Sequence, residues 1–556
     1  MSTVAEVVGA LLARLGVGYA FGVVGSGNFH VTNALRAGGV PFVAARHETG
    51  AAMMADAYAR TSGDVAVLSV HQGCGLTNAL TGIAEAAKSR TPLLVLAADT
   101  AGAAVRSNFR IDQDAAVRAV GAVPERVHTA ASAVDDVVRA YGTCARQRRT
   151  VVLNLPLDVQ AAPCELPDPL PTVAPWGVPR PDQASVAALA ALLDGAERPV
   201  FIAGRGARHA GPDVAALADR CGALLATSAV ANGLFAGDAW SLGISGGFAT
   251  PLAVELITGA DLVVAWGASL TMWTTRHGEL IGSSATVVQV DDDPTALGAQ
   301  RPVHLGVLGD VGATARDVLA AVTGGPGQRT EEVAKRIAAE GRWNDLPLPS
   351  GGDGERIDPR VLSAELDGLL PAARTLALDS GNFMGYPAAY LTVPDAAGFC
   401  FTQAFQSIGL GLATAMGAAL ARPDRVPVAA LGDGGFLMGI AELETAVRLG
   451  MGLLVVVYDD AGYGAEFHHF PHDDHGTVRF PDTDLAAIAA GFGCTAATVR
   501  APADLAVVRE WLAGPHDRPL LLDAKVRADE PSWWLAEAFK GHSDCVGDHR
   551  RARHPL

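Results

Sequence analysis

Two stretches decide the fold: RVPVAALGDGG at Arg425–Gly435 and GLLVVVYDDAGYG at Gly452–Gly464. Each begins as a short apolar run, which is typical of a buried strand, and continues into glycine and acidic residues. Apolar residues then recur at helical spacing over 436–449, so the first strand leads through a glycine turn into a helix. This order of strand, turn and helix predicts a parallel α/β sheet, in which ligands bind beyond the carboxyl ends of the strands.

Asp433 and Asp460 follow these two strands and are 27 positions apart. Parallel neighbouring strands would bring both carboxylates to the same edge of the sheet. Gly432, Gly434 and Gly435 let the backbone approach phosphate oxygens closely, and the helix N-terminus supplies free N–H groups. Because Mg²⁺ prefers one or two carboxylates together with phosphate oxygens, we predict a diphosphate and magnesium site. The alternative interpretation is a pair of ordinary acidic strand ends.

Composition narrows the class of protein. The chain has 556 residues, of which 49% are hydrophobic and 18% charged, so it is long enough for several domains that each bury a core. The net charge of −17 argues against nucleic acid as a partner. Neither a signal peptide nor a membrane-spanning run of about 18 apolar residues is recognisable. Seven cysteines without a Cys-x-x-Cys pair fit a reducing compartment, so we expect a cytoplasmic protein without a membrane partner.

Proline and charge patterns predict three domains. Prolines cluster over 163–181, and a polar stretch with one expected helix at 331–340 covers 324–356. The domains would span 1–165, 185–325 and 357–556. Each alternates short aliphatic strands with helical patterns, which indicates parallel α/β sheets flanked by helices. The expected strands are 41–45, 65–70, 92–97, 151–155, 199–203, 261–266, 286–290, 375–378, 426–431, 453–458 and 519–524.

The Gly-Asp-Gly turn and its spacing to Asp460 resemble the signature of thiamine-diphosphate (ThDP) enzymes that act on 2-oxo acids. The family pattern usually ends in Asn-Asn, whereas this chain has Asp459-Asp460. A carboxylate there attracts the cation and repels the diphosphate, and unit charges about 4 Å apart interact by roughly 4 kcal/mol at a dielectric of 20. Since a ligand lies nearer to the metal than to the phosphates, we expect attraction to dominate. The resemblance implies two cofactor-binding domains, named for the pyrimidine and the diphosphate, around a Rossmann-like middle domain.

The first domain carries the second half of the resemblance, RHETGAAMMADAYAR at Arg46–Arg60. In the family, the glutamate of this motif contacts a ring nitrogen of the aminopyrimidine, and this role falls on Glu48. Sharing a proton with that nitrogen helps the cofactor lose its thiazolium C2 proton. A buried carboxyl with a raised pKa suits this task. The alternative is that Glu48 has only a structural role, as an acidic residue stabilised by the helix dipole at a helix N-terminus.

Ser26 and His71 lie in two further loops that follow strands. Their positions resemble the serine and histidine that contact substrate in benzoylformate decarboxylase, and histidine can move protons near neutral pH. The residues after His71 resemble acetolactate synthase, although Phe109-Arg110-Ile111 replaces the Phe-Gln-Glu of its substrate loop. We expect Ser26 and His71 to be catalytic. The equally open alternative is that His71 is an ordinary loop histidine whose hydrogen bonds are made to the backbone.

Other residues are expected at the cofactor by resemblance. An aliphatic residue, here Ile408, supports the bent cofactor, and the Gly462 carbonyl joins Asp433 and Asp460 as a metal ligand. The full set of expected cofactor contacts is Gly381, Asn382, Gln406, Ile408, Gly432, Asp433, Gly434, Gly435, Asp460, Gly462 and Tyr463. Glu466 or His469 is expected to face the substrate.

Two further cofactors are weighed and disfavoured. Four histidines lie between His468 and His475, but Pro471 interrupts any helix that would present them together, so a mobile substrate loop is favoured over zinc. FAD is doubtful because the Arg-Phe-Asp-Asp-Arg run of flavin-containing acetolactate synthases is absent. His209 also occupies the third glycine position of a dinucleotide fingerprint.

The resemblance implies a homodimer or homotetramer, because the two halves of the chemistry meet across a subunit interface in this family. We expect decarboxylation of a small 2-oxo acid followed by carboligation, as in acetolactate synthase. The alternatives are a decarboxylase that does not ligate, resembling benzoylformate decarboxylase, and a catalytically silent scaffold.

Overall fold

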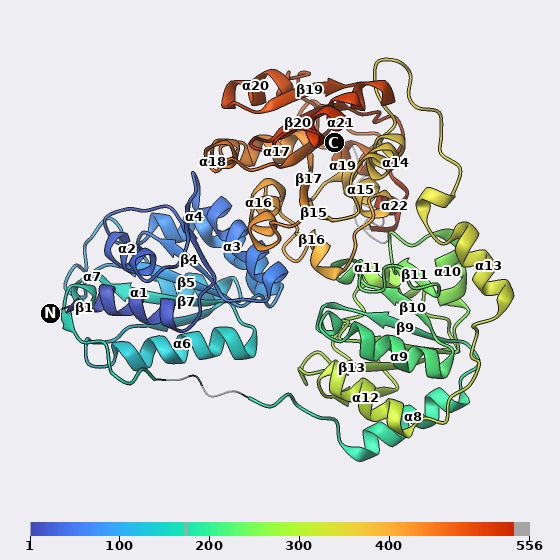
Figure 1. Cartoon of the computed structure of the whole chain (residues 1–556), viewed down its shortest axis with the longest axis horizontal. Coiled ribbons are helices and arrows are strands. Elements are labelled where there is room, and N and C mark those ends of the chain that lie inside the picture. The colour runs from blue at the N-terminus through green and yellow to red at the C-terminus, as the bar shows by residue number, and fades with distance from the viewer. Residues whose placement is uncertain (1, 172, 174–175, 539–556) are drawn as a thin grey trace, which may run out of the picture.

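The structure is a computed structural model that describes residues 2–171, 173 and 176–538 (Figure 1). Within these residues, the chain forms three six-stranded parallel sheets, each flanked by helices. Expectation and structure agree on this fold class. Each predicted domain range contains one of the sheets, while the exact domain limits stay predictions. The last 18 residues of the third range, 539–556, and part of the proline-rich stretch lie outside the described residues.

The first sheet has the order β3-β2-β4-β5-β7-β6. Its strands are β2 (Tyr19–Gly22), β3 (Phe42–Ala44), β4 (Ala66–Val70), β5 (Leu93–Asp99), β6 (Val123–Arg126) and β7 (Val151–Pro156). A separate two-stranded antiparallel pair joins β1 (Ser2–Thr3) to β8 (Pro163–Cys164). The surrounding helices are α1 (Val4–Arg14), α2 (Phe29–Ala37), α3 (Glu48–Ser62), α4 (Cys74–Lys88), α5 (Gln113–Ala119), α6 (Ala133–Gln147) and α7 (Leu157–Gln160).

The second sheet has the order β11-β10-β9-β12-β13-β14. Its strands are β9 (Pro199–Ala203), β10 (Leu224–Thr227), β11 (Ser241–Ile244), β12 (Leu262–Trp266), β13 (Thr286–Asp291) and β14 (Leu305–Leu308). The accompanying helices are α8 (Gln183–Gly195), α9 (Gly211–Cys221), α10 (Pro251–Thr258), α11 (Met272–Thr275) and α12 (Val311–Ala321). Helix α13 (Glu331–Glu340) follows in the polar stretch and coincides with the helix predicted there.

The third sheet has the order β16-β15-β17-β18-β20-β19. Its strands are β15 (Arg374–Leu378), β16 (Phe399–Phe401), β17 (Val426–Gly432), β18 (Leu454–Asp459), β19 (Thr495–Val499) and β20 (Leu520–Lys525). Its helices are α14 (Pro359–Leu369), α15 (Gly385–Tyr390), α16 (Gly411–Ala421), α17 (Asp433–Gly439), α18 (Glu442–Arg448), α19 (Gly464–His469), α20 (Leu485–Phe492), α21 (Ala506–Leu512) and α22 (Trp533–Ala538).

The single helix predicted over 436–449 is wrong in its extent. The structure has two short helices, α17 and α18, with a turn at 440–441 between them. The first helix begins earlier than predicted, at Asp433, and contains three glycines, which are weak helix formers. The early start places the free N–H groups of α17 directly at the Gly-Asp-Gly turn.

The first and third domains of one chain pack closely together along α3 and α16 (Figure 1). One buried cluster contains residues from both helices, among them Met54, Leu412 and Met416. Gly417 of α16 lies so close to α3 that an added Cβ would be 2.2 Å from the Met54 carbonyl oxygen. This close approach joins the two predicted cofactor-binding domains of a chain into one packed unit.

The part of the chain that the structure describes contains no helix with both the length and the hydropathy of a membrane span.

Candidate functional site

A cavity of about 360 Å³ lies at the carboxyl ends of β15, β17 and β18. All the residues expected at the cofactor line it: Gly381, Asn382, Gln406, Ile408, Gly432, Asp433, Gly434, Gly435, Asp460, Gly462 and Tyr463. They converge because each follows a strand or the turn after it, and the strands are parallel. The register that pairs Gly432 with Tyr458 sets the two acidic turns side by side.

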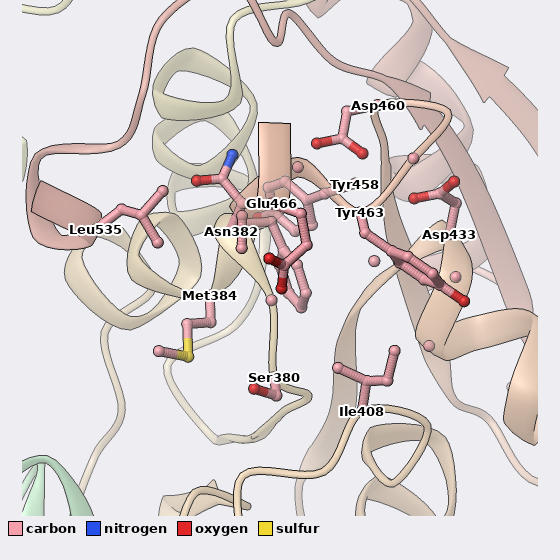
Figure 2. A pocket seen from close by; sticks show the side chains of 18 of the residues that line it. Ser380, Asn382, Met384, Ile408, Asp433, Tyr458, Asp460, Tyr463, Glu466 and Leu535 are labelled. Atoms are coloured by element: carbon pink, nitrogen blue, oxygen red, sulfur yellow. The ribbon is translucent and has the colours of Figure 1, made fainter. Parts of the chain in front are cut away.

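The acidic end of the cavity holds Asp433 and Asp460 (Figure 2). Burial, followed by the nearby carboxylate of Asp459, raises the pKa of Asp433 to about 7. Burial and the charge of Asp433 raise the pKa of Asp460 well above its usual value. A buried carboxylate and a partly buried one that repel one another in this way suit a divalent cation, whose charge would offset both.

Asp459 has a different environment from its neighbour. Its Oδ2 atom accepts a hydrogen bond of 2.6 Å from Nζ of Lys525, and both side chains are 3% exposed. Its Oδ1 atom accepts from the Ala461 N–H at 2.9 Å, and Ala461 has a φ of +56°. Asp459 therefore forms a buried ion pair and shapes the turn, so that Asp460 and Gly462 line the cavity.

The glycines of the turn after β17 are packed against neighbouring side chains. A Cβ on Gly434 would lie 2.5 Å from the Tyr463 ring. A Cβ on Gly435 would lie 2.5 Å from Oδ2 of Asp379. The backbone of the turn thus follows a path that a larger residue would block, as expected where phosphate oxygens approach main-chain N–H groups.

Asp379 was not predicted from the sequence, although it directly follows a predicted strand and precedes Gly381. The carboxylate is fully buried and accepts hydrogen bonds from the N–H groups of Ser380 at 2.8 Å, Gly409 at 2.9 Å and Leu410 at 3.3 Å. Burial raises its pKa to about 6. Asp379 ties the turn after β15 to the segment that contains Ile408.

The opposite end of the cavity is largely apolar. Figure 2 shows Met384 and Leu535 on the side away from Asp433 and Asp460, with Glu466 between the two ends. The rings of Trp273 and Trp534, with centroids 5.9 Å apart, also line it. No sequence motif points to these tryptophans, because one comes from the middle domain and the other from α22. Glu466 lines the cavity, whereas His469 is absent from its lining.

Glu48, His71 and Ser26 lie together in the first domain and do not line this cavity. Glu48 begins α3, and its Oε2 accepts a hydrogen bond of 3.1 Å from Nδ2 of Asn78. Oγ of Ser26 lies 3.4 Å from Nε2 of His71, whose ring packs on Phe109. Glu48 is only partly buried in the single chain, so its own domain does not supply the burial that we expected around it.

The histidine-rich segment is not arranged as a metal site within the described residues. No group of three or more His, Cys, Asp or Glu side chains is placed there, or elsewhere in the described chain, to hold an ion. His468 is half-buried, and burial lowers its pKa. Nε2 of His475 lies 2.8 Å from the Phe470 carbonyl oxygen, so the segment folds back on itself after α19.

In the middle domain, the turn that resembled part of a dinucleotide fingerprint packs against the loop after β12. The N–H of Gly206 donates to the Gly267 carbonyl at 3.1 Å, and a Cβ on Gly204 would be 2.3 Å from the same oxygen. These contacts pack the turn after β9 directly against the loop after β12.

Comparisons with known proteins agree with this geometry. Three family models match: the thiamine pyrophosphate enzyme N-terminal TPP binding domain at residues 2–116, the central domain at 186–318 and the C-terminal TPP binding domain at 379–524. The chain belongs to the family of thiamine-diphosphate-dependent 2-oxo acid enzymes. The N-terminal match contains Glu48, and the C-terminal match contains the whole Asp433 to Tyr463 region.

Relatives in this family differ in their reactions. The chain is 29% identical to a sulfoacetaldehyde acetyltransferase of Rhodobacter capsulatus, with 90% of each chain covered. It is 30% identical to a probable 2-ketoarginine decarboxylase of Pseudomonas aeruginosa, again with 90% of each covered. It is also 30% identical to a putative acetolactate synthase large subunit of Mycobacterium tuberculosis, with 88% of this chain and 92% of the relative covered. Family membership thus supports thiamine diphosphate as the cofactor.

Proposed function

We propose that the protein catalyses the decarboxylation of a 2-oxo acid followed by carboligation, with thiamine diphosphate and Mg²⁺. The observation that carries this proposal is the convergence of all eleven expected cofactor contacts of the third domain on one cavity, with the carboxylates of Asp433 and Asp460 at its acidic end. The similarity to a putative acetolactate synthase over most of both chains supports the ligating reaction.

Asp433, Asp460 and the Gly462 carbonyl would hold the magnesium ion, and the N–H groups of the Gly432–Gly435 turn would hold the diphosphate. Ile408, which lies below Asp433 in the view of Figure 2 and also lines the cavity, would support the bent cofactor. When bound, thiamine diphosphate supplies the carbon nucleophile and the electron sink for decarboxylation. Glu48 would hold a proton at the aminopyrimidine ring nitrogen.

The active unit that we propose is a homodimer or a larger even assembly. Glu48 does not line the cavity of its own chain, although the chemistry needs its carboxylate at the aminopyrimidine. A second copy would place its Glu48, His71 and Ser26 over this cavity. That arrangement would also supply the burial that Glu48 lacks in one chain.

A decarboxylase that releases an aldehyde is the second candidate. The pairing of Ser26 with His71 favours it, because a histidine with a serine neighbour can deliver a proton to the reacting carbon. The similarity to a probable 2-ketoarginine decarboxylase also supports simple decarboxylation. In either case, the mostly apolar cavity end around Met384 and Leu535 would receive the substrate side chain.

Product analysis distinguishes the candidates. The protein, loaded with thiamine diphosphate and Mg²⁺, would be incubated separately with pyruvate, benzoylformate, 2-ketoarginine and sulfoacetaldehyde, and also with pyruvate and sulfoacetaldehyde together. Ligated products without free aldehyde would support the first candidate, and aldehyde alone would support the second. A Glu48→Gln variant that equals the wild type in every activity and in its response to cofactor would indicate the silent scaffold instead.

A further inference from the structure

Two buried carboxylates connect the first and third domains of one chain. Each belongs to one of these domains and accepts hydrogen bonds from the backbone of the other. Glu442 of α18 belongs to the third domain and binds backbone of the first. Glu85 of α4 belongs to the first domain and binds backbone of the third. Both are at most 2% exposed, and neither lines the cavity.

Glu442 holds the two residues that directly precede Glu48. Its Oε1 atom accepts hydrogen bonds from the N–H groups of Arg46 at 3.1 Å and His47 at 3.0 Å. Oε2 accepts a 2.7 Å hydrogen bond from the Thr445 hydroxyl and a longer one of 3.3 Å from the Arg46 N–H. Gly50 makes room for this carboxylate, because a Cβ there would lie 2.4 Å from Oε1. The entry into α3, and hence the position of Glu48, is fixed by a side chain of the third domain.

Glu85 holds the segment that leads to Ile408. Its Oε2 accepts a 2.6 Å hydrogen bond from the Phe405 N–H, and Oε1 accepts one of 3.2 Å from the Ala404 N–H. Arg60 donates to Oε1 at 2.9 Å and to the Phe401 carbonyl at 3.2 Å. Gln406, which directly follows Phe405, has a backbone φ of +63°. Such a backbone conformation is unfavourable for a residue with a side chain and persists only where neighbouring contacts hold it.

We propose that Glu442 and Glu85 are reciprocal positioning residues of the cofactor site. Glu442 sets the place of Glu48, and Glu85 sets the strained segment that presents Gln406 and Ile408. The inference rests on the proposed function. In the proposed dimer, Glu48 serves the cofactor held mainly by the partner, whereas Ile408 serves the cofactor held by its own chain. Each chain therefore ties the geometry of one active site to that of the other.

The two carboxylates should respond differently to substitution by an amide. At Glu442, glutamine can keep its oxygen toward both N–H donors at their shorter distances while its amide group donates to the Thr445 hydroxyl, so that only the longer Arg46 contact is lost. At Glu85, Oε1 accepts from Arg60 and the Ala404 N–H, and Oε2 accepts from the Phe405 N–H. In a glutamine, the NH₂ group would replace one of these oxygens and would therefore face a donor. We therefore expect Glu442→Gln to rescue most of the effect of Glu442→Ala, and Glu85→Gln to be disruptive.

The first measurement is backbone amide hydrogen exchange in the protein without cofactor. Glu442→Ala should speed exchange in the peptide that contains Arg46 and His47, and Glu85→Gln should speed it in the peptide that contains Ala404 and Phe405. Matched controls are Glu444→Gln and Lys88→Gln, whose side chains contact Arg46 and the Phe405 ring from the exposed side. These controls should leave both peptides unchanged. Unchanged exchange in Glu442→Ala or Glu85→Gln would overturn the proposal.

The second measurement separates the two roles with thiamine diphosphate and Mg²⁺. Glu85→Gln should raise the Kd for thiamine diphosphate by about tenfold, because it loosens residues that line the cavity. Glu442→Ala should keep that Kd while slowing deuterium exchange at C2 of the bound cofactor by about tenfold or more, because Glu48 is misplaced. A wild-type protein that binds no thiamine diphosphate would refute the proposed function together with this inference. Normal binding by the wild type and equal binding by Glu85→Gln would refute the inference alone.

Discussion

Replacing Asp433 by asparagine should stabilise the protein at pH 8 when cofactor and metal have been removed. Asp433 is 7% exposed, and burial together with Asp459 raises its pKa to about 7 from an ordinary 3.8. A carboxyl whose pKa is raised in the folded state binds a proton more tightly than in the unfolded state. Folding stability therefore falls as the pH rises from about 4 to about 7, and the full penalty remains above that range.

The magnitude follows from the difference in pKa. Each pKa unit corresponds to 1.36 kcal/mol, so a rise from 3.8 to about 7 represents about 4 kcal/mol at pH 8. At pH 5, Asp433 stays mostly protonated in the folded chain, and the penalty is less than half of this value. Asparagine carries no charge at either pH. The Asp433→Asn variant should thus gain up to about 4 kcal/mol at pH 8 and clearly less at pH 5.

Urea denaturation of chelator-treated wild type and Asp433→Asn, at one protein concentration and at both pH values, measures this difference. Thiamine diphosphate with Mg²⁺ should raise the stability of the wild type but not that of the variant, which lacks a metal ligand. A variant no more stable than the wild type at pH 8, or an equal gain at both pH values, would show that Asp433 is not a strained buried acid.

Three further perturbations test other parts of the molecule. Glu48→Gln should lower kcat by about 10²–10⁴-fold while retaining thiamine diphosphate, as measured by steady-state kinetics and cofactor titration; a full loss of cofactor binding would contradict this. Lys525→Met should destabilise the protein by about 3–5 kcal/mol in urea denaturation, because Asp459 and Asp523 would lose their buried cation; a neutral effect would contradict the ion pair. Gly417→Ala should lower stability by about 1–3 kcal/mol through its clash with the Met54 carbonyl, whereas Gly491→Ala in α20, with open space around it, should be neutral or stabilising.

Much of the fold could be predicted from the sequence because buried parallel strands are continuous apolar runs. The predicted strand 199–203 has the same limits as β9, the prediction for β17 ends one residue early, and the prediction for β18 is shifted by one residue at both ends. The cofactor residues could be placed on one cavity because they all follow strands of one parallel sheet. Periodicity could not show the break between α17 and α18, since glycine-rich turns and helices both contain apolar residues.

The residues that sequence reasoning missed act through tertiary contacts. Trp273 reaches the cavity from the middle domain, and Trp534 reaches it from near the end of the described chain. Glu442 and Glu85 read as ordinary helix residues, because nothing local shows that each faces the backbone of another domain. Their roles depend on α3 packing against α16, a contact between segments more than 300 residues apart that no short motif encodes.

The two adjacent acids after β18 illustrate why residue identity alone does not determine charge at the site. Successive side chains near a strand end point to opposite sides. Asp459 accordingly pairs with Lys525, while Asp460 lines the cavity near Asp433. Of the Asp-Asp pair, only Asp460 therefore places its side chain in the cavity, whereas the carboxylate of Asp459 acts on Asp433 and Asp460 from outside it by raising the pKa of both. Because a divalent cation can offset the charges of Asp433 and Asp460 together, the departure from the family pattern is compatible with a magnesium site and should strengthen its hold on the metal.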